Sequence, residues 1–66
     1  MKVEENTPTA KIFNSDDKDV TDRVLDGRTA FFFNVDNAKD YAKKRRTFHY
    51  DAYDGNGNPV GYCVPK

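Results

Sequence analysis

The run Thr-Ala-Phe-Phe-Phe-Asn-Val at residues 29–35 constrains the fold more than any other part of the chain. Successive side chains of a β-strand point to opposite faces, so Phe31 and Phe33 would share one face and Phe32 would lie on the other. Burying all three rings requires cover on both faces. We therefore expect a central strand at 29–35, with a helix on one face and a second surface on the other.

The next segment has the pattern of that covering helix. Asp36 is a good N-cap residue, and we expect a helix over 37–46. Its apolar residues, Ala38, Tyr41 and Ala42, follow the spacing of three and four that places side chains on one helix face. Small alanine side chains would let the helix lie close to the sheet, with Tyr41 as its main anchor.

Residues 20–25 fit two structures. Asp26-Gly27 is a strong signal for a two-residue hairpin turn, which favours a strand at 20–25 paired with the strand at 29–35. The alternative is a helix capped by Ser15 that places Val20 and Val24 on one face and stops at Gly27. Because Asp-Gly directly precedes an evident strand, we favour the hairpin.

The rest of the chain completes an antiparallel sheet. Residues 9–13 are expected to form a strand, and 47–53 and 60–64 a closing hairpin with a type I′ turn at Asn56-Gly57. The predicted fold is α+β, of β-β-β-α-β-β order, with a small antiparallel sheet of four to five strands and one helix packed on one face. Polar residues 1–8 read as a flexible tail before a single domain at 9–66.

The reactive side chains do not compose a catalytic or metal site. One cysteine, Cys63, and one histidine, His49, exclude an internal disulfide and an ordinary zinc site. The segment Asp54-x-Asn56-x-Asn58 matches the first ligand positions of a calcium loop, but prolines stand where that loop needs Gly and Glu. We expect a protein that is not an enzyme and has no cofactor or metal.

Compartment and membrane expectations follow from composition. No stretch approaches the roughly 18 apolar residues of a membrane span, and the first residues lack the apolar run of a signal peptide. A lone thiol is simplest to maintain in a reducing compartment. The sequence therefore predicts a cytoplasmic protein without membrane association.

Charge is unevenly distributed although the net charge is zero. Residues 1–26 carry seven acids and four bases, whereas residues 27–50 carry six bases and two acids. A balanced total speaks against a generic nucleic-acid binder, but such polarity can steer a partner. Cations gather at the end of the predicted helix, where they complement the helix dipole. The dipole accounts for one or two of these cations. There are five of them, namely Lys39, Lys43, Lys44, Arg45 and Arg46.

The following strand would carry a second set of candidate contacts. On one face we expect Phe48 and Tyr50 in the core, and on the other an exposed row that includes His49 and Tyr53. Arg46-x-Phe48-x-Tyr50-x-x-Tyr53 partly resembles the RNA-stacking motif of RRM domains. Larger residues replace the small ones of that motif and the element order differs, so the RRM function is not transferred.

These features predict a small non-enzymatic module that binds and regulates a larger protein. In general type the chain is similar to small bacterial or phage accessory proteins, and no specific family is identified from its residues. Tyr53 or Phe32 would anchor the contact. The alternatives are a nucleic-acid-binding module that uses the same surface and a structural homodimer. The predicted contact residues are Lys39, Lys43, Lys44, Arg45, Arg46, His49 and Tyr53.

Overall fold

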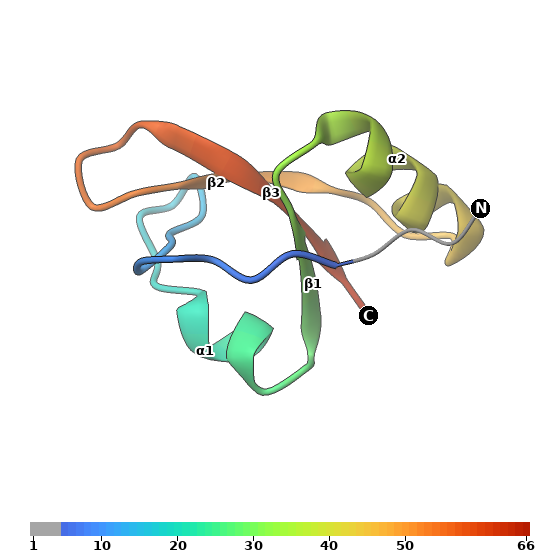
Figure 1. The fold of residues 1–66 in the computed structure, drawn as a ribbon, viewed down its shortest axis with the longest axis horizontal. Coiled ribbons are helices and arrows are strands. Elements are labelled where there is room, and N and C mark those ends of the chain that lie inside the picture. The colour runs from blue at the N-terminus through green and yellow to red at the C-terminus, as the bar shows by residue number, and fades with distance from the viewer. Residues whose placement is uncertain (1–4) are drawn as a thin grey trace.

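A computed structural model describes residues 5–66 as an α+β fold with two helices and a three-stranded antiparallel sheet (Figure 1). In the sheet, β3 lies between β1 and β2. Both neighbours of β3 run antiparallel to it. In chain order the elements are α1 (Thr21–Leu25), β1 (Thr29–Phe32), α2 (Val35–Lys44), β2 (Tyr50–Tyr53) and β3 (Pro59–Pro65).

The consecutive phenylalanines of β1 divide the core between the two faces of the sheet. Phe32 packs with Tyr41 of α2, at 5.2 Å between ring centroids, whereas Phe31 lies on the opposite face. The face beneath α2 buries Ala30, Phe32, Val64, Ala38, Tyr41 and Ala42. The other face is covered by α1 and by residues 5–13, which we call the N-terminal segment. This face buries Ile12, Val20, Phe31, Ala52 and Cys63. The expectation of cover on both faces is confirmed.

The expected sheet of four to five strands is wrong, because neither segment before β1 forms a strand. In residues 9–13, the backbone of Phe13 pairs with Tyr53 on one side and Asp19 on the other, through single bridges. The neighbouring amide of Ile12 instead donates to the side-chain oxygen of Thr21, at 2.9 Å. A turn begins immediately at Asn14, so the pairing does not propagate into a ladder.

The segment 20–25 holds helix α1 (Thr21–Leu25) and no strand, so the expected hairpin and the single-helix architecture are both wrong. The amide of Gly27 donates to the carbonyl of Val24 (3.1 Å), and that of Arg28 to the carbonyl of Arg23 (3.0 Å). These two bonds form a Schellman motif, which needs a left-handed residue after the helix. Gly27, with φ of 86°, fills that position. The Asp26-Gly27 pair therefore ends a helix instead of turning a hairpin.

The expectation of a central strand at 29–35 is wrong, because β1 ends at Phe32 and lies beside β3 at the edge of the three-stranded ladder. Phe33, which we expected to be buried, lies beyond the strand and is 52% exposed. On its outer side, the amide of Asn6 donates to the carbonyl of Phe31 at 2.7 Å. The side-chain oxygen of Asn6 also accepts from the amide of Phe33, at 3.0 Å. Asn6 thus fixes the end of β1 from within the expected tail at 1–8, of which residues 1–4 lie outside the described part.

Helix α2 begins two residues earlier than the sequence predicts. The side chain of Asn34 accepts from the amides of Asp36 (2.8 Å) and Asn37 (3.3 Å), so Asn34 is the N-cap. Asp36 instead lies in the first turn, where its negative charge complements the helix dipole. The predicted inward face is confirmed, since Ala38, Tyr41 and Ala42 are buried.

The β2–β3 turn is not of type I′. The amide of Gly57 donates to the carbonyl of Asp54, and the amide of Asp54 to the carbonyl of Asn58. Of the turn residues only Gly57 has positive φ, at 83°, whereas type I′ requires it at both central positions. The pattern is that of a three-residue hairpin loop, a type I turn closed by one left-handed residue.

Within residues 5–66, no helix has the length and apolar character needed to cross a membrane.

Candidate functional site

Arg46 occupies a strained backbone position at the end of α2. The amide of Arg46 donates to the carbonyl of Lys43 (3.2 Å), and that of Thr47 to the carbonyl of Ala42 (3.0 Å). This is the Schellman motif that also ends α1, but here Arg46 takes the glycine position with φ of 56°. A residue with a Cβ pays roughly 1–2 kcal/mol for the left-handed conformation.

We expected all five cations to lie on a helix over 37–46, and this is only partly correct. Lys39 and Lys43 lie one turn apart on α2, but the helix ends at Lys44, so Arg46 is outside it. Arg45 packs over the ring of Tyr41, 4.6 Å from its centroid. The Nζ atom of Lys44 lies 3.4 Å from a carboxylate oxygen of Asp40.

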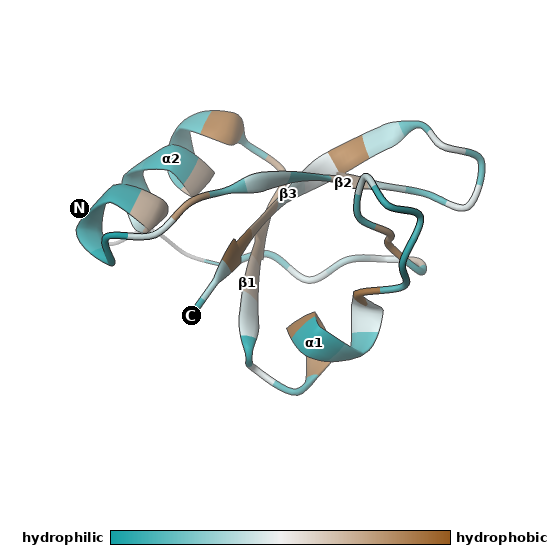
Figure 2. Ribbon diagram, turned by 180° about the vertical axis from the view of Figure 1, so that it is seen from behind, coloured by the Kyte–Doolittle hydropathy of each residue, from teal (hydrophilic) through white to brown (hydrophobic). Residues whose placement is uncertain are grey.

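All five predicted cations are exposed, and we call them the basic surface. Lys44 alone among them has a carboxylate oxygen within 4 Å in residues 5–66. Figure 2 shows that much of α2 is hydrophilic, as expected for a helix that buries a narrow face. The basic surface therefore keeps a positive surplus at the end of α2.

Phe48 is exposed, contrary to the expectation that it lies in the core. The side chain is 63% exposed because residues 47–49 connect α2 to β2 and do not belong to the sheet. Its ring remains near that of Tyr50, at 6.2 Å between centroids, and Tyr50 is partly buried against the α1 side of the sheet. A large apolar side chain thus follows the basic surface directly.

The remaining predicted contact residues are engaged within the protein. The ring of His49 meets that of Tyr62 edge-on, at 6.4 Å between centroids. The hydroxyl of Tyr53 donates to a carboxylate oxygen of Asp51 at 3.4 Å. Tyr53 also lies at the opposite end of β2 from α2, about 10 Å along the strand from Tyr50 at ~3.3 Å per residue. Phe32 is fully buried, which excludes it as an anchor for a partner.

A hollow of about 330 Å³ lies between α1 and β2. Arg23 of α1 and Tyr50 of β2 are both partly buried and line this hollow. Burial raises the pKa of Tyr50, whereas the nearby Arg23 acts to lower it. The other residues that line the hollow are Asn14, Ser15, Asp16, Thr29, Phe48 and Pro65.

Sequence reasoning missed this hollow. Arg23 stands between Val20 and Val24 in a segment that we took for a strand, and one cation in such a segment carries no signal of its own. Only the packing of α1 against the sheet brings Arg23, Tyr50 and Phe48 around one space.

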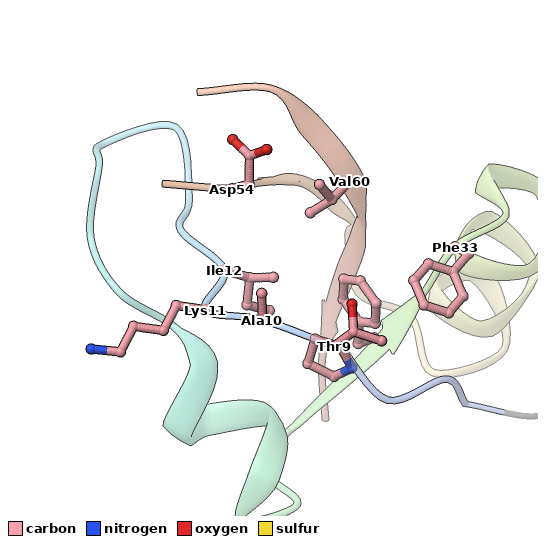
Figure 3. Close-up of a pocket in the computed structure, with 9 residues that line it drawn as sticks. Thr9, Ala10, Lys11, Ile12, Phe33, Asp54 and Val60 are labelled. Carbon is pink, nitrogen blue, oxygen red and sulfur yellow. The ribbon is translucent and has the colours of Figure 1, made fainter. Parts of the chain in front are cut away.

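A second, smaller hollow of about 40 Å³ lies under the N-terminal segment (Figure 3). Exposed Phe33 and Val60 help to line it, together with Ala10 and Ile12. The side chain of Lys11 extends away from these apolar groups. The volume is close to that of one water molecule, so this hollow is a packing feature and not a ligand site.

Comparison of the chain with models of known protein families, with curated proteins and with solved structures gives no match. Residues 5–66 contain no group of three or more His, Cys, Asp or Glu side chains placed to hold a metal ion. The candidate site consequently rests on the basic surface, Phe48 and the adjoining hollow.

Proposed function

We propose that this protein is a non-enzymatic binding module that attaches to an acidic surface of a larger protein and modulates it. The basic surface supplies the charge that steers and orients the partner. Phe48 supplies an apolar anchor, since aromatic side chains are enriched at protein interfaces.

The observation that carries this proposal is the conformation of Arg46. Glycine at this position would relieve backbone strain, as Gly27 does at the end of α1. The helix dipole does not require a cation there, because Lys43, Lys44 and Arg45 already lie in the last turn or at the C-cap. Strained non-glycine residues cluster at functional sites, so Arg46 is best explained by a contact with a partner.

The exposure of Phe48 also supports the proposal that the partner binds at the basic surface. Burying a phenylalanine side chain stabilises a protein by roughly 1.5–3 kcal/mol, and here most of that ring remains in contact with water. Partner binding would bury it beside the cations. A regulatory role, as in small accessory proteins of bacteria or phages, is the form of this function that we favour.

The test is affinity capture from a lysate of the native host with three forms of the tagged protein, each run with and without nuclease. Wild-type protein should retain a stoichiometric protein partner. Arg46→Gly should fold with equal or greater stability, yet retain the partner at least about fivefold less well, a loss of roughly 1 kcal/mol. Lys18→Gln, in the turn before α1, is the matched control and should bind as wild type.

Two outcomes would contradict the proposal. Partner capture that is equal for wild type and Arg46→Gly would remove the argument from backbone strain. Capture that disappears with nuclease, together with tight and strongly salt-dependent binding to a single-stranded oligonucleotide, would identify a nucleic-acid-binding module instead.

A further inference from the structure

The hollow between α1 and β2 contains a cation that lacks a carboxylate partner. Arg23 is partly buried, and no carboxylate oxygen of residues 5–66 lies within 4 Å of its guanidinium. Arg28, just after α1, is the contrast, because it is exposed and lies 2.7 Å from a carboxylate oxygen of Asp26. Partly desolvated charges are stabilised by a counter-charge, so the Arg23 site favours an anionic group.

The surroundings of Arg23 add an apolar wall. Tyr50 lines the hollow together with Arg23. Phe48 and Pro65 line the same hollow and offer apolar surface. The Arg23 side chain suits a carboxylate, because the guanidinium donates hydrogen bonds to the carboxylate oxygens and adds charge.

We propose, resting on the protein-binding function above, that this hollow receives a partner segment in which a carboxylate side chain adjoins an aromatic or large aliphatic one. The carboxylate binds Arg23, and the apolar side chain packs on Phe48 and Pro65. About 330 Å³ is at the small end of ligand sites, which fits one or two side chains of an extended peptide. Phe48 joins this hollow to the basic surface, so one acidic partner can engage both.

Asp16 provides a test of the sign of the charge on the bound group. Its exposed carboxylate lies at the same hollow and opposes an anionic ligand. Asp16→Asn should therefore strengthen binding about twofold to threefold at low salt. If the ligand group were cationic, the same change would weaken binding, and this result would overturn the proposal.

The direct test is an NMR titration of the ¹⁵N-labelled protein with the peptide acetyl-Gly-Glu-Phe-Gly-amide. Saturable shifts are expected at the amides of Arg23, Thr29 and Tyr50. The peptide with Gln in place of Glu should bind about tenfold more weakly, equivalent to roughly 1.4 kcal/mol. Equal binding of both peptides, or shifts confined to other residues, would overturn the proposal.

Protein variants complete the test. Arg23→Gln and Phe48→Ala should each weaken the Glu peptide about tenfold, whereas Arg28→Gln should leave its affinity unchanged. An intact ¹⁵N spectrum of each variant establishes that the fold is retained. Arg23→Lys should bind the Glu peptide more tightly than Arg23→Gln but less tightly than wild type, because Lys lacks the planar, bidentate geometry that matches a carboxylate.

The same variants distinguish failure of this inference from failure of the proposed function. If partner capture depends on Arg46 but no binding responds to Arg23→Gln, the inference is wrong and the proposed function stands. If the peptide binds through Arg23 but capture is independent of the basic surface, the hollow stands as a peptide site and the proposed function is wrong.

Discussion

Phe13 and Tyr53 exchange two backbone hydrogen bonds, each amide donating to the carbonyl of the other residue at 2.8 Å. Each of the two residues is followed immediately by a turn. The turns lie forty residues apart in the chain and have the same hydrogen-bond pattern. This reciprocal pair holds them together at the end of the sheet, where both contribute to one shallow hollow.

The correspondence extends to the side-chain hydrogen bonds of the two turns. The side-chain oxygen of Asn14 accepts from the amides two and four residues later (both 3.0 Å), and that of Asp54 does the same (2.8 and 2.9 Å). The left-handed residue is Asp17 (φ 65°) in the first turn and Gly57 (φ 83°) in the second. The two turns therefore share their hydrogen bonds and differ in the residue that bears the positive φ.

This difference predicts opposite effects of exchanging the two residues. Asp17→Gly should raise the free energy of unfolding by roughly 0.5 kcal/mol, because relief of strain outweighs the greater entropy of the unfolded chain. Gly57→Asp should lower it by about 1 kcal/mol. Urea unfolding of both variants measures the two values, and a shift of the same sign in both would refute the equivalence of the turns.

Gly61 is required by the close approach of β3 to Phe31. A Cβ atom at this position would lie 2.5 Å from the Cζ of Phe31 and 2.7 Å from the carbonyl oxygen of Phe32. Gly61→Ala should lower the free energy of unfolding by about 3 kcal/mol. Gly55→Ala is the control, since the nearest atom to its Cβ would be 4.0 Å away and its φ is not positive. Chemical denaturation should show nearly wild-type stability for the control.

The buried hydroxyl of Tyr41 has no hydrogen-bond partner among residues 5–66. Tyr41→Phe keeps the ring against Phe32 and beneath Arg45 and removes the unsatisfied group. We expect the free energy of unfolding to rise by up to about 1 kcal/mol. A loss above 1 kcal/mol in thermal unfolding would mean that the hydroxyl makes a bond to water that stabilises the fold.

Acid should weaken the β2–β3 turn through Asp54. The amide of Asn58, aided by those of Asn56 and Gly57, lowers the pKa of Asp54 below its usual 3.8. A depressed pKa in the folded state stabilises the protein above the unfolded-state value, and this contribution is lost as the pH falls through and below 3.8. Asp54→Asn should keep the turn at neutral pH and make stability less dependent on pH between about 5 and 2. An unchanged pH profile would contradict this.

Cys63 should be unreactive while the protein is folded. The thiol is fully buried, and burial raises its pKa from 9.0 to about 11. Because the folded pKa exceeds the unfolded one, this group stabilises the fold below pH 9 and loses that contribution as the pH rises from 9 to 11. Thiol labelling at pH 8 should follow the rate of opening, and added urea should accelerate it. Labelling as fast as that of free cysteine would contradict the burial.

The sequence predicts the position of a side chain correctly where a single physical requirement decides it. Ala38, Tyr41 and Ala42 had to face the sheet because no other helical face is apolar, and they do. Asp26-Gly27 was misread because glycine serves a hairpin turn and a helix C-terminus equally well, and local sequence does not distinguish them. We expected Phe48 to lie on the core face of a strand at 47–53, but strand β2 begins only at Tyr50, so the alternation of faces does not apply to Phe48.

The candidate site was predicted in part. Exposure of the basic surface follows from its charge, so its residues could be named from the sequence. The conformation of Arg46 could not be foreseen, because the end of α2 depends on bonds from residues beyond the helix. His49 and Tyr53 were chosen as an exposed row, but Tyr62 and Asp51 engage their side chains.

The sequence alone determined that the neighbouring Phe31 and Phe32 need cover on opposite faces of the sheet, because side chains alternate along a strand and exposed rings are costly. It also determined the polarity of charge along the chain. Only the tertiary structure decided what supplies the cover, placing α2 on one face and α1 with the N-terminal segment on the other. That choice depends on contacts between residues far apart in sequence, and the same contacts bring Arg23, Tyr50 and Phe48 around one hollow.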